Sequence, residues 1–263
     1  MAFTRRRPRS ESNQEGESFW ISFSDLMSAL VMIFILAVVV LVLQLSEKQH
    51  ELTVQQDKVQ VQQDRFNDQV STLREAEVVR KDMLEEMQKT LKDRGIDVLI
   101  TENNSVLSIP SEKLGFAAAS YDIDDEFKGV AMSIGSVISG SIQTDDRMKF
   151  LDTVFVEGHT DNVRFKGLEG TGNWGLSTFR AISLWSLWDE ELPPTLNLGK
   201  LQNQNSQLLF SVSGYGQSRP VASQQDNDEK RAANRRIDIR FTIVRPDAED
   251  LLNISKSLDK AGK

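Results

Sequence analysis

A long apolar segment near the N-terminus constrains this chain more than any other feature. Between Phe19 and Leu43 the only charged residue is Asp25. A helix of about 25 residues is roughly 37 Å long at 1.5 Å per residue, whereas a hydrocarbon core of roughly 30 Å needs about 20 residues. The segment therefore predicts one membrane-spanning helix over residues 19–45.

A cleavable export signal is the alternative, because arginines precede the apolar run. It is disfavoured because the run is too long and because the residues that follow, LQLSEKQH, offer no small-residue cleavage site. Positive residues favour the cytoplasmic side of a membrane. Residues 1–18 are therefore expected to be a cytoplasmic basic tail, with everything after the span in the periplasm beyond the inner membrane. The arginines that precede the span are Arg5, Arg6, Arg7 and Arg9, against Lys48 and Lys58 after it.

Asp25 is a carboxylate about six residues, or roughly 9 Å, inside the apolar run. An ionised Asp costs roughly 2.5–3.5 kcal/mol at the centre of a spanning helix, and less at a shallower depth. Such residues usually face a bundle interior or a water-filled path, where they relay protons. The alternative is a hydrated interfacial acid with Ser22, Ser24 and Ser28 nearby. A relay also requires a membrane partner, because one helix cannot enclose a path.

Composition excludes several classes of protein and site. The net charge of −8 argues against a nucleic-acid surface, which needs a basic face. The chain has no cysteine, so disulfides and thiolate metal sites are ruled out. His50 and His159 lie far apart and form no ligand pattern, and no nucleotide-binding, nucleophile-elbow or paired-His motif is present. We therefore expect no metal and no cofactor.

Residues 46–95 have the composition of a long solvated helix. No Gly or Pro occurs from Ser46 to Arg94, and Gly95 is a stop signal. Spacing by seven residues gives a partial coiled-coil pattern, with a single solvated helix or a loose linker as the alternative. The apolar residues on this spacing are Leu45, Leu52, Val59, Phe66 and Leu73, and later Leu84 and Leu91.

Residues 96–246 change to alternating strand and helix patterns, which predict an α+β domain: an α/β sandwich with one mixed sheet covered by helices. Asn103-Asn104 separates two expected strands, and Ile237, Ile239, Phe241 and Ile243 alternate along the last one. Helices are expected over DEFKGVAMSIGSVISGSI and over NWGLSTFRAISLWSLWDEEL, which Pro193-Pro194 ends. The apolar face of the second helix is expected to comprise Leu176, Phe179, Ala181, Ile182, Leu184, Trp185 and Trp188. Residues 247–263 are a tail or a last helix.

Four ordered blocks resemble the OmpA-like peptidoglycan-binding domain: VEGHTDN, NWGLSTFRA, GYGQSRPVA and KRAANRRIDIRF. FWISFSDLMSALVMIF resembles the spanning segment of MotB-type stator proteins, with the Trp-to-Asp spacing one residue shorter than in flagellar stators. The arginine-rich tail and the SFSDLM entry are similar to those of the MotB-like subunits of Zorya anti-phage systems. Two insertions interrupt the resemblance, around RFKGLEGTG and around TLNLGKLQNQNSQ.

The resemblance implies roles for individual residues. Asp25 matches the family's proton-carrying carboxylate, a catalytic role without bond chemistry. Asp161 matches the acid that binds the diaminopimelate of the peptidoglycan stem peptide, and Arg180 matches the arginine of the Leu-Ser-x-x-Arg-Ala block. The remaining residues expected to bind peptidoglycan are Asn173, Thr160, Arg235 and Arg236. The alternatives are a turn role for Asp161, a surface ion pair for Arg180 and a bracing role for Arg235 or Arg236.

The resemblance also implies partners. The chain is expected to form a homodimer inside a ring of five MotA-like subunits, which are ZorA in the Zorya systems, and to grip peptidoglycan while protons drive the ring. It would break no covalent bond. The alternatives are a flagellar-type MotB-like stator subunit and a passive tether between membrane and cell wall. Trp174 stands where the family has a polar residue and is expected to alter the rim of the binding pocket.

Overall fold

The structure is a computed structural model that describes residues 12–116, 119–167 and 169–245, with side chains described from residue 19 onward. The N-terminal arginines that predict orientation lie outside the described residues. So does the predicted C-terminal tail, residues 247–263. The chain divides into two units, and the compact second unit extends from Phe66 onward.

The first helix, α1 (Ser12–Asp93), is one continuous element of 82 residues. The predicted span 19–45 and the predicted helical linker 46–95 are thus parts of the same helix. Gly95 has φ +78°, a left-handed conformation that favours glycine, so the predicted stop is confirmed. Within the described residues, α1 is the one helix long and apolar enough to cross a membrane.

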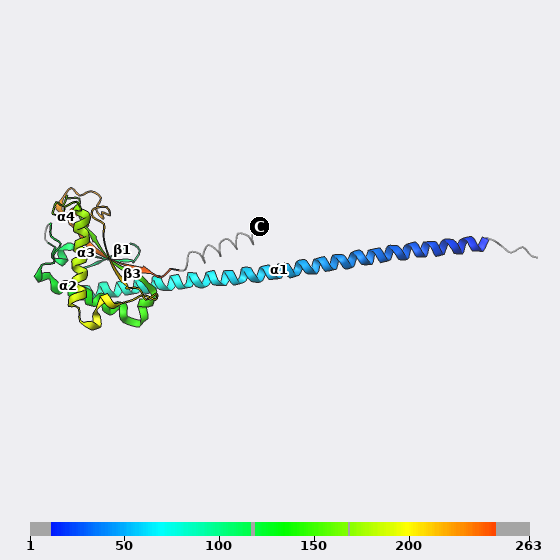
Figure 1. The fold of residues 1–263 in the computed structure, drawn as a ribbon, viewed down its shortest axis with the longest axis horizontal. Helices are drawn as coiled ribbons and strands as arrows, with labels where there is room; N and C mark the ends of the chain where they lie inside the picture. The colour runs from blue at the N-terminus through cyan, green and yellow to red at the C-terminus, as the bar shows by residue number, and fades with distance from the viewer. Residues whose placement is uncertain (1–11, 117–118, 168, 246–263) are drawn as a thin grey trace, which may run out of the picture. The chain divides into compact units, whose positions relative to one another are not determined.

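The second unit contains a mixed sheet, of which Figure 1 labels the strands β1 and β3. In the part of the chain that the structure describes, this sheet has five strands in the order β1-β2-β5-β3-β4. Strands β3 and β4 are parallel, and the other neighbours are antiparallel. The predicted α+β fold, one mixed sheet with helices, is confirmed. The strands are β1 (Leu99–Thr101), β2 (Val106–Pro110), β3 (Leu151–His159), β4 (Phe210–Gly214) and β5 (Arg236–Ile243).

The helices of this unit fall between the strands as the sequence patterns predict. Asn103 and Asn104 turn the chain between β1 and β2 with positive φ. The α-helices are α2 (Asp125–Gln143), α3 (Gly172–Glu191) and α4 (Asp228–Asn234). The short 3-10 helices are η1 (Ser111–Leu114), η2 (Thr144–Phe150), η3 (Pro194–Leu196) and η4 (Leu198–Lys200).

The last turns of α1 belong to the core of the second unit. Met83, Leu84, Met87 and Leu91 are fully buried, in one cluster with residues of the sheet, α2 and α3. The predicted domain boundary at residue 96 lies after these four side chains, which belong to the core cluster. The sequence pattern did not reveal this, since the same heptad spacing continues from exposed positions into buried ones.

Helix α3 packs with a narrower apolar face than its sequence predicts. Leu184 and Trp188 are fully buried, and the Trp188 indole Nε1 donates a hydrogen bond of 2.8 Å to the carbonyl of Ala131 in α2. Phe179 and Ile182 were expected on this face, but they remain exposed. The expectation failed because a single sheet face and α2 cover only part of the circumference of the helix.

The register of the strands separates an apolar face from a polar one. Directly opposed residues in a sheet point to the same side. Val156 pairs with Ile239 on the side that contributes to the core, whereas Glu157 pairs with Asp238 on the opposite side. Ser108 of β2 also pairs with Asp238, so it extends the polar row. Helices cover the first face, and the second carries ionised side chains.

Gly158 lets α3 approach the end of β3. A Cβ atom at this position would lie 1.9 Å from the carbonyl oxygen of Ser177, a distance that real Cβ contacts do not reach. Gly214 at the end of β4 is equally close to α3, with Thr178 Oγ1 2.2 Å from its hypothetical Cβ. The two glycines bring α3 directly against the strand ends, where Thr160 and Asp161 follow.

Candidate functional site

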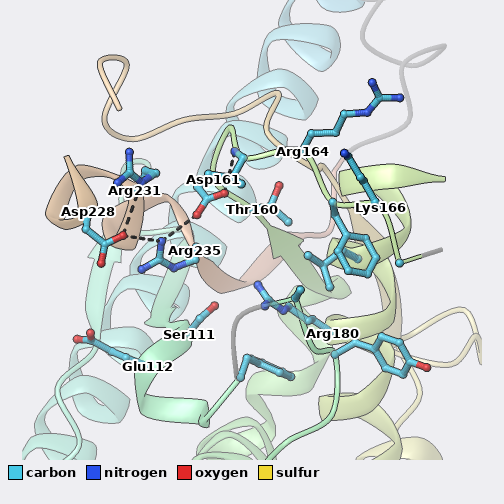
Figure 2. Close-up of a pocket in the computed structure, with 17 residues that line it drawn as sticks. Ser111, Glu112, Thr160, Asp161, Arg164, Lys166, Arg180, Asp228, Arg231 and Arg235 are labelled. Atoms are coloured by element: carbon cyan, nitrogen blue, oxygen red, sulfur yellow. Dashed lines mark hydrogen bonds and ion pairs between the residues drawn. The ribbon is translucent and has the colours of Figure 1, made fainter. Parts of the chain in front are cut away.

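A cavity of about 890 Å³ opens beyond the carboxyl end of β3 (Figure 2). Its walls come from η1, the segment after η1, the segment after β3, α3 and the region of α4. Five cationic and three acidic side chains line it, so its surface favours anions. These charged residues are Arg164, Lys166, Arg180, Arg231 and Arg235, with Glu112, Asp161 and Asp228.

Asp161 is held in place from two sides. Its Oδ1 accepts a hydrogen bond of 3.0 Å from the backbone N–H of Val163, and its Oδ2 accepts one of 2.8 Å from Arg235 Nη1. Arg235 also lies 3.7 Å from Asp228 (Figure 2). Asp161 thus has the turn role considered as an alternative, and the same carboxylate lines the cavity. The two roles are compatible because a carboxylate has about four acceptor sites.

Arg180 is a buried cation in the cavity wall, only 2% exposed. Its Nε donates a hydrogen bond of 2.8 Å to the carbonyl of Ser120, and its guanidinium carbon lies 5.3 Å from the centre of the Phe116 ring. Burial lowers the pKa of Arg180 to about 10, although the charge of Asp161 opposes the shift. An anionic ligand would further stabilise the charged form.

Two hydroxyl groups in the wall are buried without a hydrogen-bond partner. They are Thr160 Oγ1 and Ser111 Oγ, and both residues line the cavity. The backbone N–H of Thr160 donates to the carbonyl of Gly216, which fixes the residue in place. Buried hydroxyls normally have partners. Both hydroxyl groups are therefore available to a ligand.

Asn173 braces the cavity from behind. Its Nδ2 donates to the carbonyls of Asp161 and Val163, at 3.2 and 3.0 Å, and its Oδ1 accepts from the backbone N–H of Phe165 at 2.8 Å. These bonds tie the segment after β3 to the first turn of α3. Asn173 is not among the residues that line the first cavity, so its geometry is that of a positioning residue.

Arg236 lies on the polar face of the sheet and does not line the cavity. Its Nε is 3.1 and 3.0 Å from the two carboxylate oxygens of Asp238. The structure therefore brings together four of the residues predicted to bind peptidoglycan, namely Thr160, Asp161, Arg180 and Arg235. It assigns Arg236 to the bracing role that the sequence left open for one of the two adjacent arginines.

The polar face holds a buried ionic network. Ligand atoms of Glu157, His159 and Asp238 lie within 4.8 Å of one another, a spacing that suits a metal ion. However, Arg240 makes two hydrogen bonds of 2.9 Å to Glu157, and Arg236 binds Asp238. Each carboxylate is therefore neutralised by an arginine, and the cluster forms a charge-balanced brace. The sequence did not reveal that His159 belongs to this cluster, because its partner Asp238 is distant in the chain.

Several residues of the cavity wall were not among the predicted site residues. Arg231 belongs to the KRAANRR block, so that motif could have indicated it. Arg164 and Lys166 come from the first insertion, for which the family pattern predicts nothing. Ser111 and Glu112 follow β2, far from the motifs. Only the pairing of β2 with β5 brings them to the cavity, where the backbone N–H of Ser111 donates to the carbonyl of Arg235.

Asp25 lies in the apolar part of α1, outside the unit that contains the cavity. Ser22 and Ser28 are three residues away on either side, so they share its helix face. The side chains from residue 19 to residue 50 are all exposed in the single chain. The apolar segment thus offers lipid, or other helices, a surface with one carboxylate on it.

The chain is similar in sequence to one known motility protein. The chain is 36% identical to Motility protein B of Bacillus subtilis (strain 168) over 86 residues, which are 33% of this chain and 28% of that protein. Over this stretch the chain is similar to that protein. The match thus spans less than a third of the length of the relative. No protein-family model matches the chain.

Two solved structures are also similar to this chain. The periplasmic domain of Helicobacter pylori MotB is 25% identical, with a TM-score of 0.40, over 59% of this chain and 84% of that one. The cell wall anchor of the T6SS from Pseudomonas aeruginosa is 26% identical, with a TM-score of 0.43, over 63% of this chain and 99% of that one.

Proposed function

We propose that this protein is the peptidoglycan-anchored, proton-conducting stator subunit of a membrane motor, and specifically a ZorB protein of a Zorya anti-phage system. One combination of features carries the proposal. A single chain joins a membrane-length apolar helix bearing one carboxylate to a compact unit with a charged cavity at Asp161. A motor subunit needs both a proton-carrying group in the membrane and a fixed external anchor.

The cavity suits the diaminopimelate of a peptidoglycan stem peptide, which carries an ammonium group and carboxylates. Asp161 can accept hydrogen bonds from the ammonium, since its carboxylate lines the cavity. Arg235 and Arg180 supply cations for a carboxylate, to which guanidinium groups bind in a bidentate manner. The unpartnered hydroxyls of Thr160 and Ser111 add two donors. Together these groups match a zwitterionic ligand with excess negative charge.

The membrane half of the proposal assigns the proton to Asp25. Two copies of the chain would lie inside a ring of five MotA-like ZorA subunits, which would enclose the path that a single helix cannot. Each Asp25 would take up a proton from the periplasmic side and release it to the cytoplasm, with the N-terminus cytoplasmic and the cavity unit periplasmic. The chain itself would break no covalent bond.

A flagellar-type MotB-like stator subunit is the second candidate. The sequence match to a protein named Motility protein B favours it. The site chemistry is the same in both cases, so the cavity does not distinguish them. A gene deletion does: loss of swimming with unchanged phage resistance would support the flagellar role, whereas phage sensitivity with normal swimming would support the defence role.

The wall-binding part is tested with the substitution Asp161→Asn in the detergent-solubilised full-length chain. The variant keeps the size of the side chain but loses the charge that would meet the ammonium. A hydrogen bond to a charged group contributes about 1.5–3 kcal/mol, so we expect affinity for purified sacculi to fall about 10- to 100-fold. Free diaminopimelate should compete with the sacculi for the cavity of the wild-type protein.

Glu190→Gln is the matched control, because Glu190 is an exposed acid of α3 that does not line the cavity. It should bind sacculi as the wild type does. Undiminished binding by Asp161→Asn would exclude this cavity as the wall site. A wild-type protein that does not bind sacculi would overturn the anchoring function itself.

A further inference from the structure

A second cavity adjoins the first and has no role in the proposed function. Its volume is about 580 Å³. Arg164, Phe165 and Lys166 line both cavities, so the insertion after β3 forms a common wall between them. The other lining residues are Asn162, Glu169, Gly170, Thr171, Gly172, Asn173, Trp174 and Gln217.

Trp174 is the distinctive residue of this groove. Its side chain is 57% exposed, although a tryptophan at the start of a helix usually buries part of its ring against the fold. Its backbone is fixed, because its carbonyl accepts hydrogen bonds of 2.9 Å from the hydroxyls of both Ser177 and Thr178. The position of the indole is thus set by α3 while its surface stays open. Contrary to expectation, Trp174 lines this second groove and not the first cavity.

Polar amide groups surround the indole. Gln217 accepts a hydrogen bond from the Asn173 amide, which orients its side chain toward the groove. Asn162 lies on the same wall, and its backbone N–H donates to Gln225, which fixes that segment. An exposed aromatic surface beside amide donors and acceptors suits a ligand with both an apolar face and many hydroxyl or acetamido groups. A sugar ring has this chemistry.

We propose that the Trp174 groove binds the amino-sugar glycan strand of peptidoglycan, next to the cavity that takes its stem peptide. This inference rests on the proposed wall-binding function. The shared wall carries the argument, since the stem peptide is covalently attached to the glycan and its two parts must occupy neighbouring sites. Arg164 and Lys166 line both cavities and give the shared wall positive charge, which matches carboxylates near the peptide attachment.

The test separates the two ligand parts by using two probes with the detergent-solubilised full-length chain. One probe is glycan strands freed of peptides by an amidase, and the other is a soluble diaminopimelate-containing stem peptide. For Trp174→Ala, isothermal titration should show at least about fivefold weaker binding of the glycan strands, the scale expected on truncating an aromatic anchor. Binding of the stem peptide should stay within about twofold of the wild type. Asp161→Asn should show the converse pattern.

Trp174→Tyr should restore most glycan binding, because it keeps an aromatic face. Leu208→Ala is the control for loss of an exposed apolar side chain, because Leu208 lines neither cavity. The inference is overturned if the wild type does not bind peptide-free glycan strands, or if Trp174→Ala binds them unchanged. Neither result contradicts the proposed function, provided that the wild type binds the stem peptide and Asp161→Asn binds it more weakly. Loss of stem-peptide binding by the wild type would instead overturn the proposed function.

Discussion

At the scale of single residues, two adjacent arginines illustrate how one short motif serves two sites. Arg235 caps α4 and pairs with Asp161 in the cavity, while Arg236 opens β5 and pairs with Asp238 on the polar face of the sheet. Successive side chains at the start of a strand point to opposite faces. The first arginine is therefore available to a ligand, and the second stabilises the fold.

The substitution Asp238→Asn tests the bracing role. Asp238 is 2% exposed, and the variant would leave the guanidinium of Arg236 buried without its counter-charge. Breaking one partner of a buried ion pair costs about 3–5 kcal/mol, and we expect a loss of that order in the free energy of unfolding by urea. Asp226→Asn, which removes an exposed ion pair with Lys230, should cost less than about 1 kcal/mol. Equal losses of unfolding free energy in the two variants would contradict a bracing role for the Arg236–Asp238 pair.

The ionisation of Asp238 should also make the free energy of unfolding depend on pH. Burial raises the pKa of Asp238, but the imidazole of His159, whose Nε2 lies 3.2 Å from Asp238 Oδ2, and the charge of Arg236 outweigh it, so the pKa lies below the ordinary value of 3.8. The folded state thus binds this proton less readily than the unfolded chain. Its stabilisation is complete above pH 3.8 and is lost as the pH falls below that value. Between pH 7 and pH 2, the free energy of unfolding from urea titrations should fall more steeply for the wild type than for Asp238→Asn.

At the scale of elements, the cavity exists because α3 packs directly against the ends of β3 and β4. Gly158 and Gly214 permit this approach, and Asn173 then ties the first turn of α3 to the segment after β3. Any residue that pushes α3 away from the strands would also move Arg180 relative to Asp161. Packing at the strand ends and binding geometry are therefore coupled.

Gly158→Ala should expose this coupling. The added methyl group would overlap the carbonyl of Ser177, and over-packing of this kind costs about 1–3 kcal/mol or more. Thermal unfolding should show the loss, and binding of sacculi should weaken with it. Gly129→Ala in α2 has open space around its hypothetical Cβ and should instead stabilise the protein by about 0.5–1 kcal/mol. A neutral Gly158→Ala would contradict the close packing.

The end of α1 is the other element that behaves differently from its sequence pattern. Leu84→Ala would remove a fully buried side chain, so we expect a loss of about 2–5 kcal/mol in the free energy of unfolding of the second unit. Val78, 51% exposed in the same helix, provides the control, and its truncation to alanine should change stability by less than about 0.5 kcal/mol. If Leu84→Ala were equally mild, α1 would end outside the core.

At the scale of the whole molecule, one chain combines a membrane-length helix with a charged cavity that we propose binds the cell wall, and the proposed motor needs both. Asp25→Asn retains the shape of the side chain but abolishes its titration. Co-expressed with the proposed MotA-like partner, the variant should assemble normally and bind sacculi normally, yet proton flux into vesicles should fall to the background level. Flux equal to that of the wild type would exclude Asp25 as the carrier and favour the passive tether.

The sequence alone determined the features that depend on local pattern. The apolar run, the unbroken helix after it, the turn at Asn103-Asn104 and the alternation along β5 all follow from residue spacing, so each could be predicted. The pair of Asp161 and Arg180 was indicated by motif blocks, which place both residues at the ends of recognisable elements. The predicted elements were confirmed because they required no knowledge of which distant segments meet, whereas the binding roles of Asp161 and Arg180 stay predictions.

Only the tertiary structure decided which side chains share a cavity or a core. Pairing of β2 with β5 brings Ser111 to Arg235, and the register of β3 against β5 places Glu157 beside Asp238. The tertiary structure also turns Arg236 away from the cavity and buries the last turns of α1. Sheet register and helix packing depend on contacts between residues far apart in the chain, and these contacts leave no periodic signal in the local sequence.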